Sequence, residues 1–384
     1  MNIGFDAKRA MENTTGLGHY SRTLISSLAA FYPENQYYLY APRATNLYLT
    51  KEEKNITLRT PRHFPGNIFK SWWRSGGLVP DVQKDNLDIY HGLSHEIPAG
   101  ISGSKIISVV TMHDIIFEIF PHQYKTADRI IYRKKFKYAL RHADEIIAIS
   151  LQTKKDLIRV YGAREDKITV CYQSCDPIYF KNTDEEVRAV VRTKYNLPKK
   201  YFLFVGSIIE RKNLLQVCQG LALLEEKIPL VVIGNGKAYK KKVQDFIKAQ
   251  NLGAQVIFLS ENSASRALPL SGENFPAIYQ MATAFIYPSL YEGFGIPILE
   301  ALCSGVPVVT TPVSCMPETA GDAALYVEPD DAVGMANAMQ QILENPSLAN
   351  ELRRKGFIQA QKFTPQKCAA AVMDVYKKLM HAHR

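Results

Sequence analysis

Short apolar segments of strand length alternate with amphipathic segments of helical length along this chain. Strands and helices that alternate in this way form parallel β-sheets with helices packed on them. The alternation breaks at 173–181, where Asp176 and Pro177 disrupt both periodicities, and then restarts. Because 384 residues also exceed one domain of roughly 150 residues, we expect an α/β protein of two Rossmann-like domains that face a cleft.

The expected elements are delimited by apolar periodicity and by turn residues. Strands are expected at 2–6, 37–41, 56–60, 88–91, 105–112, 145–150, 167–171, 201–206, 230–234, 256–259, 284–287, 306–310 and 324–327. Helices are expected at 17–31, 128–141, 151–161, 184–195, 275–281, 332–343, 346–362 and 365–381. In open parallel sheets a ligand binds beyond the carboxyl ends of the strands, so we expect the functional residues in the loops that follow them.

The composition is that of a folded protein and leaves several partners open. Hydrophobic residues make up 46% of the chain and charged residues 22%, a balance that excludes a disordered chain. Lys and Arg number 47 against 37 Asp and Glu, which gives a formal net charge of +10. Nucleic acid, anionic lipid and phosphorylated metabolites are all compatible with this excess.

Compartment is predicted from three features of the sequence. The N-terminal residues lack the basic and long apolar regions of a signal peptide, and no apolar run approaches the roughly 20 residues that span a bilayer. The six cysteines show no CxxC pair and no spacing suited to zinc. We therefore expect a cytoplasmic protein with reduced, mostly buried thiols and no metal centre.

Two loops at strand ends offer groups that bind anions. The first, ENTTGLGHY, places Gly16 and Gly18 at the start of a helix whose N–H groups attract an anion, unless the loop is only a tight turn. The second, GSIIERKN, begins at Gly206 and places Arg211 beside Lys212. Adjacent cations at a strand end are costly unless an anion or carboxylates lie opposite them; the alternative is a solvated pair that opens a helix.

The segment YPSLYEGFGIPILE carries the densest pattern. Pro297 suits the first turn of a helix, so we expect the backbone N–H groups of 294–296 to point toward a ligand. Glu300 lies in that helix, where the helix dipole is an alternative reason for a carboxylate. Glu292 lies among glycines, and we expect its carboxylate to accept hydrogen bonds from ligand hydroxyls.

The segment EGFGIPILE, with seven residues between its glutamates, resembles the signature of the family-4 retaining glycosyltransferases, which have the GT-B fold. The loop with Gly16 and Gly18, the pair His113 and Asp114 after a strand, and GSIIERKN occur in the same order, so the resemblance covers almost the whole chain. It implies an acceptor-binding domain over 1–175, a nucleotide-sugar-binding domain over 176–364, and a C-terminal helix, 365–384, that packs back on the first domain.

The resemblance also implies a role for each residue of the second domain. The residues that match Arg211 and Lys212 bind the donor diphosphate in that family, and the one that matches Glu300 binds the ribose. Glu292 would hold the donor sugar's hydroxyls together with the backbone of Phe294, Gly295 and Ile296. If Glu292 and Lys212 contact ligand and not core, replacing either by alanine should nearly abolish transfer and leave the fold intact.

Histidines at strand ends have two interpretations. A lone histidine such as His113 after an apolar strand is more often a hydrogen-bonded core residue than a catalytic one. The resemblance instead implies that His113 lies beside the donor sugar, where it positions a hydroxyl or eases charge at the reacting carbon, and that Asp114 orients loops or ligands. His91 and His19 point toward the same cleft by this comparison, with simple packing as the alternative.

The implied reaction is transfer of a hexose, with mannose favoured, from a GDP- or UDP-sugar to a glycan or lipid-linked acceptor in cell-surface polysaccharide synthesis, with retained anomeric configuration. Arg211, Lys212 and helix N-termini supply positive charge for the leaving diphosphate, so no metal is expected. One alternative is a nucleotide-sugar 2-epimerase of the same fold, which the two-glutamate pattern disfavours. The other is a nucleic-acid-binding protein, whose basic residues would form one continuous stripe.

Two segments of the first half combine basic and aromatic residues. One, NIFKSWWRSGG, contains Lys70, Trp72, Trp73 and Arg74. The other, RIIYRKKFKYALR at 129–141, is expected to carry charges on one helical side and apolar residues on the other. Both suit an anionic membrane surface at which the protein is peripheral, while sugar stacking and an ordinary solvated helix are the alternatives.

Two segments depart from the family pattern. YQSCD replaces the usual proline-asparagine-glycine turn after the strand at 167–171, so we expect the linker to contact ligand differently. SENSASRALPLSGEN, at 260–274, is longer than the usual connection near the nucleotide base. The choice between GDP and UDP therefore stays open.

Overall fold

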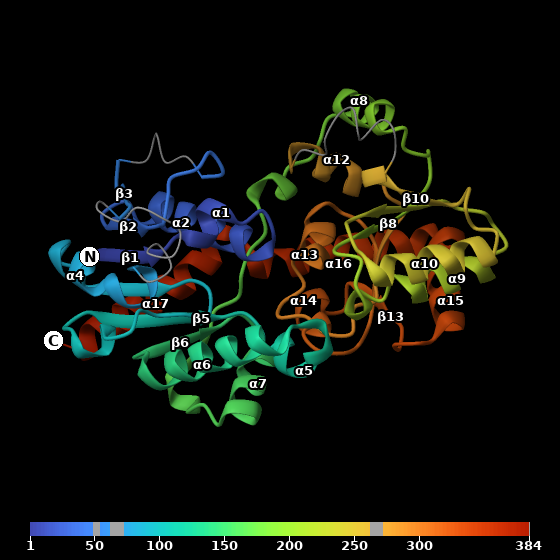
Figure 1. Cartoon of the computed structure of the whole chain (residues 1–384). Helices are drawn as coiled ribbons and strands as arrows, with labels where there is room; N and C mark the ends of the chain where they lie inside the picture. The colour runs from blue at the N-terminus through green and yellow to red at the C-terminus, as the bar shows by residue number, and fades with distance from the viewer. Residues whose placement is uncertain (49–53, 62–72, 262–271, 384) are drawn as a thin grey trace. The chain divides into compact units, whose positions relative to one another are not determined.

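The computed structural model describes residues 1–48, 54–61, 73–261 and 272–383. They divide into two compact units (Figure 1): unit 1 comprises Met1–Asp176 with Phe363–Arg384, and unit 2 comprises Pro177–Lys362. Each unit contains one parallel sheet with helices packed on it. The expected α/β class is confirmed.

The sheet of unit 1 has the strand order β3-β2-β1-β4-β5-β6-β7, and all neighbouring strands run parallel. Every residue of the inner strand β5 is buried, because helices cover both faces of the sheet. The strands are β1 (Asn2–Asp6), β2 (Gln36–Tyr40), β3 (Ile56–Arg59), β4 (Ile89–Gly92), β5 (Ile107–Met112), β6 (Glu145–Ala148) and β7 (Ile168–Val170).

The last helix of the chain completes unit 1. α17 packs against α2, so the C-terminal segment lies with the N-terminal strands (Figure 1). Tyr376 of α17 is fully buried there. The helices of this unit are α1 (Lys8–Glu12), α2 (Gly16–Phe31), α4 (Val79–Lys84), α5 (Ile116–Ile119), α6 (Thr126–His142), α7 (Leu151–Tyr161) and α17 (Pro365–Ala382).

The sheet of unit 2 has the order β10-β9-β8-β11-β12-β13 and is also parallel throughout. Its strands are β8 (Phe202–Val205), β9 (Leu230–Ile233), β10 (Val256–Phe258), β11 (Ala284–Tyr287), β12 (Val308–Thr310) and β13 (Ala324–Tyr326). Its helices are α8 (Glu185–Tyr195), α9 (Leu214–Leu223), α10 (Ala238–Ala249), α12 (Phe275–Gln280), α13 (Ile296–Cys303), α14 (Met316–Ala320), α15 (Ala332–Glu344) and α16 (Pro346–Ala360).

Side-chain caps set several helix starts. Ser150, Asn345 and Thr364 each accept a hydrogen bond from the backbone N–H three residues ahead, which satisfies a donor that the helix itself leaves unpaired. The strand expected at 145–150 therefore ends at Ala148, because Ser150 already caps α7.

The expected membrane-facing role of the Trp73 segment is wrong for the residues described. Trp73 is only 2% exposed, packs in the core of unit 1, and donates from Nε1 to Asp81 Oδ2 at 2.7 Å. The Arg74 guanidinium forms ion pairs with Asp6 and Glu96. An indole and a guanidinium that are satisfied inside the protein do not reach a lipid headgroup. Lys70, Trp72 and most of the 260–274 connection lie outside the described residues.

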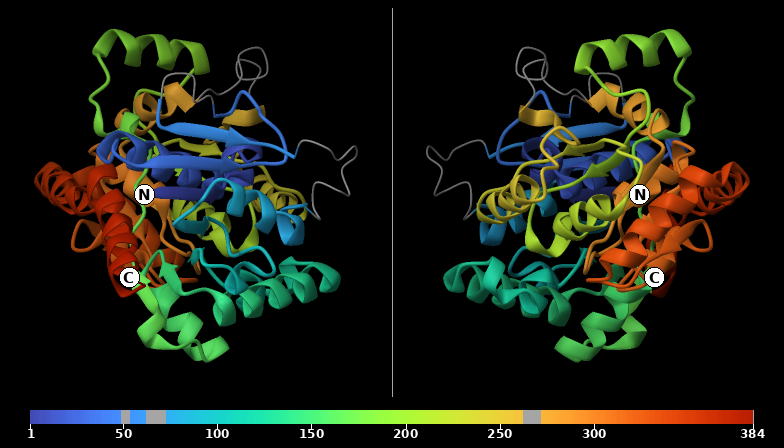
Figure 2. Two further views of the ribbon diagram at one scale, coloured as in Figure 1. Left: turned by 90° about the vertical axis from the view of Figure 1, so that its left-hand side faces the viewer. Right: turned by 90° about the vertical axis from the view of Figure 1, so that its right-hand side faces the viewer.

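Helix α6 also differs from its expected pattern. Phe136 and Ala139 face the core, as expected for an apolar side, but Ile130 and Ile131 are 61% and 51% exposed. Figure 2 shows this helix, in teal, on the outside of unit 1. The separation of charged and apolar residues onto opposite sides is therefore wrong: the exposed face of α6 carries Ile130, Ile131, Lys134, Lys137 and Arg141.

Candidate active site

Two loops of unit 2 meet because their strands are neighbours. β8 and β11 pair in parallel, so their carboxyl ends lie at the same edge of the sheet. The loop after β8 ends in a short 3₁₀ turn, Glu210–Lys212, and the loop after β11 leads into α13. Leu290 N donates to the Arg211 carbonyl at 2.8 Å, which ties the two loops together.

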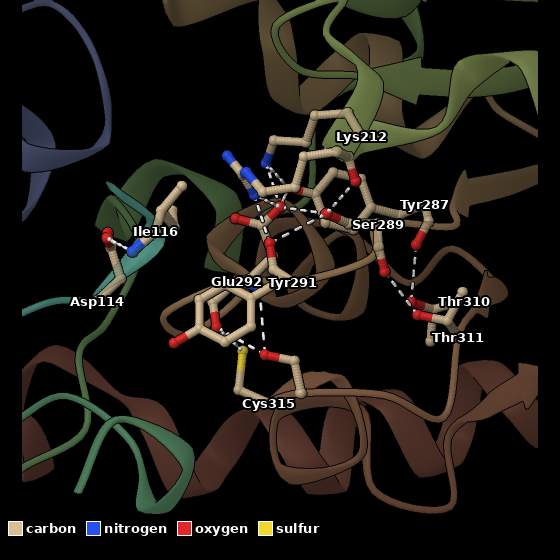
Figure 3. Close-up of polar contacts among 12 residues, drawn as sticks. Asp114, Ile116, Lys212, Tyr287, Ser289, Tyr291, Glu292, Thr310, Thr311 and Cys315 are labelled. Atoms are coloured by element: carbon tan, nitrogen blue, oxygen red, sulfur yellow. Dashed lines mark hydrogen bonds and ion pairs between the residues drawn. The ribbon is translucent and has the colours of Figure 1, made fainter. Parts of the chain in front are cut away.

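A buried charged trio of Arg211, Lys212 and Glu292 lies where these loops meet. Figure 3 labels two of its members, Lys212 and Glu292. Arg211 Nη1 lies 2.7 Å and Lys212 Nζ 2.5 Å from Glu292 Oε1. The exposed fractions are only 7%, 9% and 8%, so the solvated-pair interpretation of the two cations is wrong. A carboxylate does lie opposite them. Two cations and one carboxylate nevertheless give the trio a formal net charge of +1, and burial lowers the pKa of Lys212 despite its ion pair with Glu292.

Glu292 Oε1 accepts hydrogen bonds from two hydroxyl groups in addition to the two cations. Ser289 Oγ donates to it at 2.5 Å and Tyr287 OH at 3.1 Å. Burial raises the pKa of Glu292, but Lys212 and Arg211 outweigh burial and lower it to about 2. The expectation of a carboxylate available to ligand hydroxyls is wrong for Oε1. Among the described residues, the side-chain donors to this carboxylate all reach Oε1 and none reaches Oε2.

Hydroxyl and thiol side chains hold the backbone of the Glu292 loop. Thr311 Oγ1 donates to Ser289 O at 2.7 Å, and Cys315 Sγ donates to Glu292 O at 3.2 Å (Figure 3). Ser314 Oγ adds a bond to Glu292 O at 2.9 Å. Sequence reasoning missed these residues, because single polar residues after β12 show no pattern that separates them from turn residues.

The segment that follows Glu292 turns directly into α13. Gly295 has φ +89°, a left-handed conformation that glycine adopts at little cost, and it caps the helix. Phe294 is buried and its carbonyl accepts from Thr319, while Ile296 is the first helical residue. Pro297 lies in the first turn, as expected.

Two other expected residues of unit 2 flank this arrangement. Glu300 lies beyond the first turn of α13 and accepts from Tyr279 OH at 2.9 Å, so the helix dipole does not explain it. Gly206 follows β8, where a Cβ would lie 3.8 Å from the Tyr287 ring and 3.9 Å from the Lys212 side chain.

In unit 1 the two glycines of the first loop differ. Gly18 packs so closely that a Cβ would lie 1.8 Å from Asn13 O, which fits a tight turn. Gly16 is the first residue of α2, and a Cβ there would meet no atom within 4 Å. His19 is exposed, with Nε2 3.2 Å from Thr14 O.

Two histidines of unit 1, His91 and His113, are buried in hydrogen-bonded positions. His113 Nε2 lies 2.8 Å from Leu93 O, and burial lowers the pKa of His113 to about 3. His91 bonds to Tyr376 and Thr111 through both ring nitrogens, so its packing interpretation holds. Asp114 Oδ1 accepts from Ile116 N at 2.9 Å, and thereby holds the start of α5 (Figure 3).

Three further observations concern metals, thiols and membranes. In the described ranges no group of His, Cys, Asp and Glu side chains is arranged to hold a metal ion. All six cysteines are buried free thiols. No helix within the described residues has the length and apolar character needed to cross a bilayer.

Glu292→Gln is expected to destabilise the protein, contrary to the expectation that the fold stays intact. It leaves two buried cations without a counter-charge, and we expect a loss of about 3 kcal/mol in the free energy of unfolding at pH 7. Because the pKa of Glu292 is lowered, its contribution is present above its ordinary value of 4.5 and is lost as pH falls toward about 2. Urea unfolding across this pH window measures the difference between wild type and variant.

The control is Lys212→Met combined with Glu292→Gln, which keeps the net charge of the trio. It should recover part of the lost stability. A Glu292→Gln protein as stable as wild type at pH 7 contradicts the buried ion-pair assignment.

Comparison with known proteins identifies the family. The sequence model described as "Glycosyl transferases group 1" matches residues 188–359, and that described as "Glycosyltransferase Family 4" matches residues 14–177. The O-antigen chain mannosyltransferase B of Escherichia coli is 27% identical over 397 aligned residues, which cover 99% of this chain and 100% of that one.

Two solved structures share the fold across nearly the whole chain. Anabaena Alr3699/HepE in complex with UDP-glucose matches with a TM-score of 0.75 at 16% identity, over 98% of this chain and 100% of that one. WaaG, a glycosyltransferase involved in lipopolysaccharide biosynthesis, matches with a TM-score of 0.70 at 17% identity, over 98% and 99%. The chain belongs to the group 1, family-4 glycosyltransferases, a family of retaining enzymes with the GT-B fold.

Proposed function

We propose that this glycosyltransferase moves a hexose, with mannose favoured, from a nucleotide-diphosphate sugar to a glycan or lipid-linked acceptor in cell-surface polysaccharide synthesis. The likeness to an O-antigen chain mannosyltransferase over the full length of both chains supports the sugar and the type of acceptor. The observation that carries the proposal is the charged trio, in which two buried cations share one carboxylate oxygen.

The donor diphosphate is proposed to bind at Arg211 and Lys212. A buried net charge of +1 is unfavourable by itself, and a bound anion would neutralise it. Arg offers a planar pair of N–H donors to phosphate oxygens, and Lys adds a point charge. Since these groups are already fixed by Glu292, little reorganisation is needed when negative charge develops on the leaving diphosphate.

Glu292 is proposed to serve both the protein and the donor. Its Oε1 fixes the two cations, while Oε2 is proposed to accept from a hydroxyl of the donor sugar. The backbone of Phe294, Gly295 and Ile296, at the start of α13, is proposed to donate to the same sugar, and Glu300 to bind the ribose. Gly206 is proposed to let the donor approach the backbone beside Lys212.

The groups of unit 1 are proposed to act on the sugar and the acceptor. The proposed role of His113 is contact with the donor sugar, and that of Asp114 is to hold the loop at the start of α5. Gly16, which has open space around it, is proposed to admit a ligand at the start of α2, with Gly18 shaping the turn. Because cationic side chains neutralise the diphosphate, we propose that no metal ion takes part.

The experiment is a transfer assay with GDP-, UDP-, ADP- and dTDP-sugars, in the presence of a chelator and a polysaccharide-precursor acceptor. We expect acceptor-dependent release of the nucleoside diphosphate, with GDP-mannose among the active donors. Lys212→Met should reduce kcat/KM about 100-fold, since a charge-assisted contact to the diphosphate is worth about 3 kcal/mol. The control is Lys242→Met, which removes an exposed lysine of α10.

Conversion of a nucleotide sugar without any acceptor would indicate the epimerase instead. Loss of transfer in the chelator would contradict the metal-free proposal. Equal activity of Lys212→Met and wild type would contradict the diphosphate site.

We propose that the protein binds an anionic phospholipid bilayer and encounters its acceptor at that surface. Arg133 and Lys135 of α6 form internal ion pairs, whereas Lys134, Lys137 and Arg141 are exposed on the same face as two isoleucines. An ordinary surface helix would bury those isoleucines. Apolar side chains beside cations are the composition of helices that lie in a headgroup layer.

Lys134→Glu with Lys137→Glu should weaken binding to vesicles that contain anionic phospholipid. Each basic residue near such a surface contributes about 1 kcal/mol, so loss of both should weaken binding roughly 30-fold, and the two added negative charges should weaken it further. Vesicle sedimentation measures this, and Lys242→Glu with Lys248→Glu on α10 is the control of equal charge change. Equal loss in both double variants, or no loss in the first, contradicts docking through α6.

A further inference from the structure

His95 lies in the loop after β4 and has an unusual backbone conformation. Its φ is +66°, in the left-handed region that residues other than glycine seldom adopt. The conformation is held by neighbours: His95 N donates to Thr111 O at 3.0 Å, and the ring packs 4.7 Å from the Phe136 ring. Thus β5 holds the backbone of His95, and α6 contacts its imidazole ring.

The fixed imidazole of His95 reaches the backbone of His113. Its Nε2 lies 2.9 Å from His113 N, and the two rings are 5.2 Å apart in an edge-on arrangement. A backbone N–H can only donate, so Nε2 of His95 accepts and its ring proton lies on Nδ1. Burial lowers the pKa of His95 to about 3, so the ring stays in this accepting form at neutral pH.

His113 has the opposite tautomer. Its Nε2 lies 2.8 Å from the Leu93 carbonyl, which can only accept, so Nε2 carries the proton. The neutral ring then has its lone pair on Nδ1. Tyr20 packs edge-on against this ring at 4.6 Å, and the Tyr20 hydroxyl bonds to Thr111 Oγ1 at 3.0 Å. The ring is thus held by contacts from several elements of unit 1.

We propose that His95 is a positioning residue: by accepting from the backbone N–H of His113 it holds the His113 ring so that Nδ1 faces a ligand as a hydrogen-bond acceptor. The inference rests on the proposed place of His113 beside the donor sugar. A neutral acceptor binds a sugar hydroxyl, and it neither protonates the leaving diphosphate nor carries positive charge. Of the two roles inferred from the sequence for His113, this geometry supports the positioning of a hydroxyl.

The test compares His95→Gln with His95→Leu. Glutamine places an acceptor oxygen near the position of Nε2, whereas leucine places none, and both variants carry the same left-handed backbone. We expect kcat to fall about tenfold in His95→Leu and to stay within about threefold of wild type in His95→Gln. Matching melting temperatures for the two variants show that the difference does not come from unfolding.

A double-variant cycle separates positioning from an independent contribution. If His95 acts through His113, His95→Leu causes no further loss of kcat in a His113→Ala background. The proposal is overturned if the fold-losses of kcat in the two single variants multiply in the double variant. It is also overturned if the kcat of His95→Leu stays within about twofold of wild type.

A spectroscopic measurement tests the geometry without any activity. In ¹⁵N-histidine NMR at neutral pH we expect His95 to be protonated at Nδ1 and His113 at Nε2, and His95→Leu to change the His113 signals. The same tautomer for both rings overturns the proposal. A wild-type protein that shows these tautomers but transfers no sugar would overturn the proposed function and leave the hydrogen-bond geometry standing.

Discussion

The candidate site of unit 2 depends on one interaction, the buried ion pairing of the Glu292 carboxylate with Arg211 and Lys212. Arg211 and Lys212 cannot lie side by side at low exposure unless a negative group faces them, because buried cations repel and lose hydration. Glu292 supplies one negative charge to two positive ones. We propose that this imbalance favours an anion at the site, while the hydroxyls of Ser289 and Tyr287 donate to the carboxylate and hold it in place.

The parallel sheets explain why such groups meet at all. β8 and β11 are far apart in the sequence but adjacent in the sheet, so both loops end at one edge. The same rule operates in unit 1, where β4 and β5 are neighbours and the loops with His95 and His113 follow them. In both units a strand fully buried on two faces gives a rigid base, and polar side chains at its carboxyl end are then held in fixed orientations.

The sequence predicts the fold well because the residues that face a core must be apolar, and the spacing of these residues indicates which segments are strands and which are helices. The strands expected at 2–6 and 284–287 coincide with β1 and β11. The Trp73 segment fails for the opposite reason. Tryptophan beside arginine suits both a membrane surface and a core, and the partners that decide the matter, Asp81 for Trp73 and Asp6 for Arg74, are not marked by any pattern.

For the site, sequence reasoning finds the charged residues but not how they contact one another. It predicts that Glu292 faces ligand hydroxyls, because the sequence around Glu292 does not indicate that Arg211 and Lys212 lie next to it at the edge of the sheet. His95 is missed altogether: a histidine in a loop has no periodicity, and its left-handed backbone is visible only in three dimensions. Composition likewise does not show that the isoleucines of α6 lie on its exposed side.

The central claim is that the excess positive charge of the trio binds the donor diphosphate. Calorimetric titration of wild type and Lys212→Met with GDP, UDP and the matching nucleosides tests it most directly. We expect wild type to bind at least one diphosphate far more tightly than its nucleoside, and Lys212→Met to lose roughly tenfold or more of that affinity while nucleoside binding is unchanged. Equal diphosphate affinity in the two proteins would contradict the account.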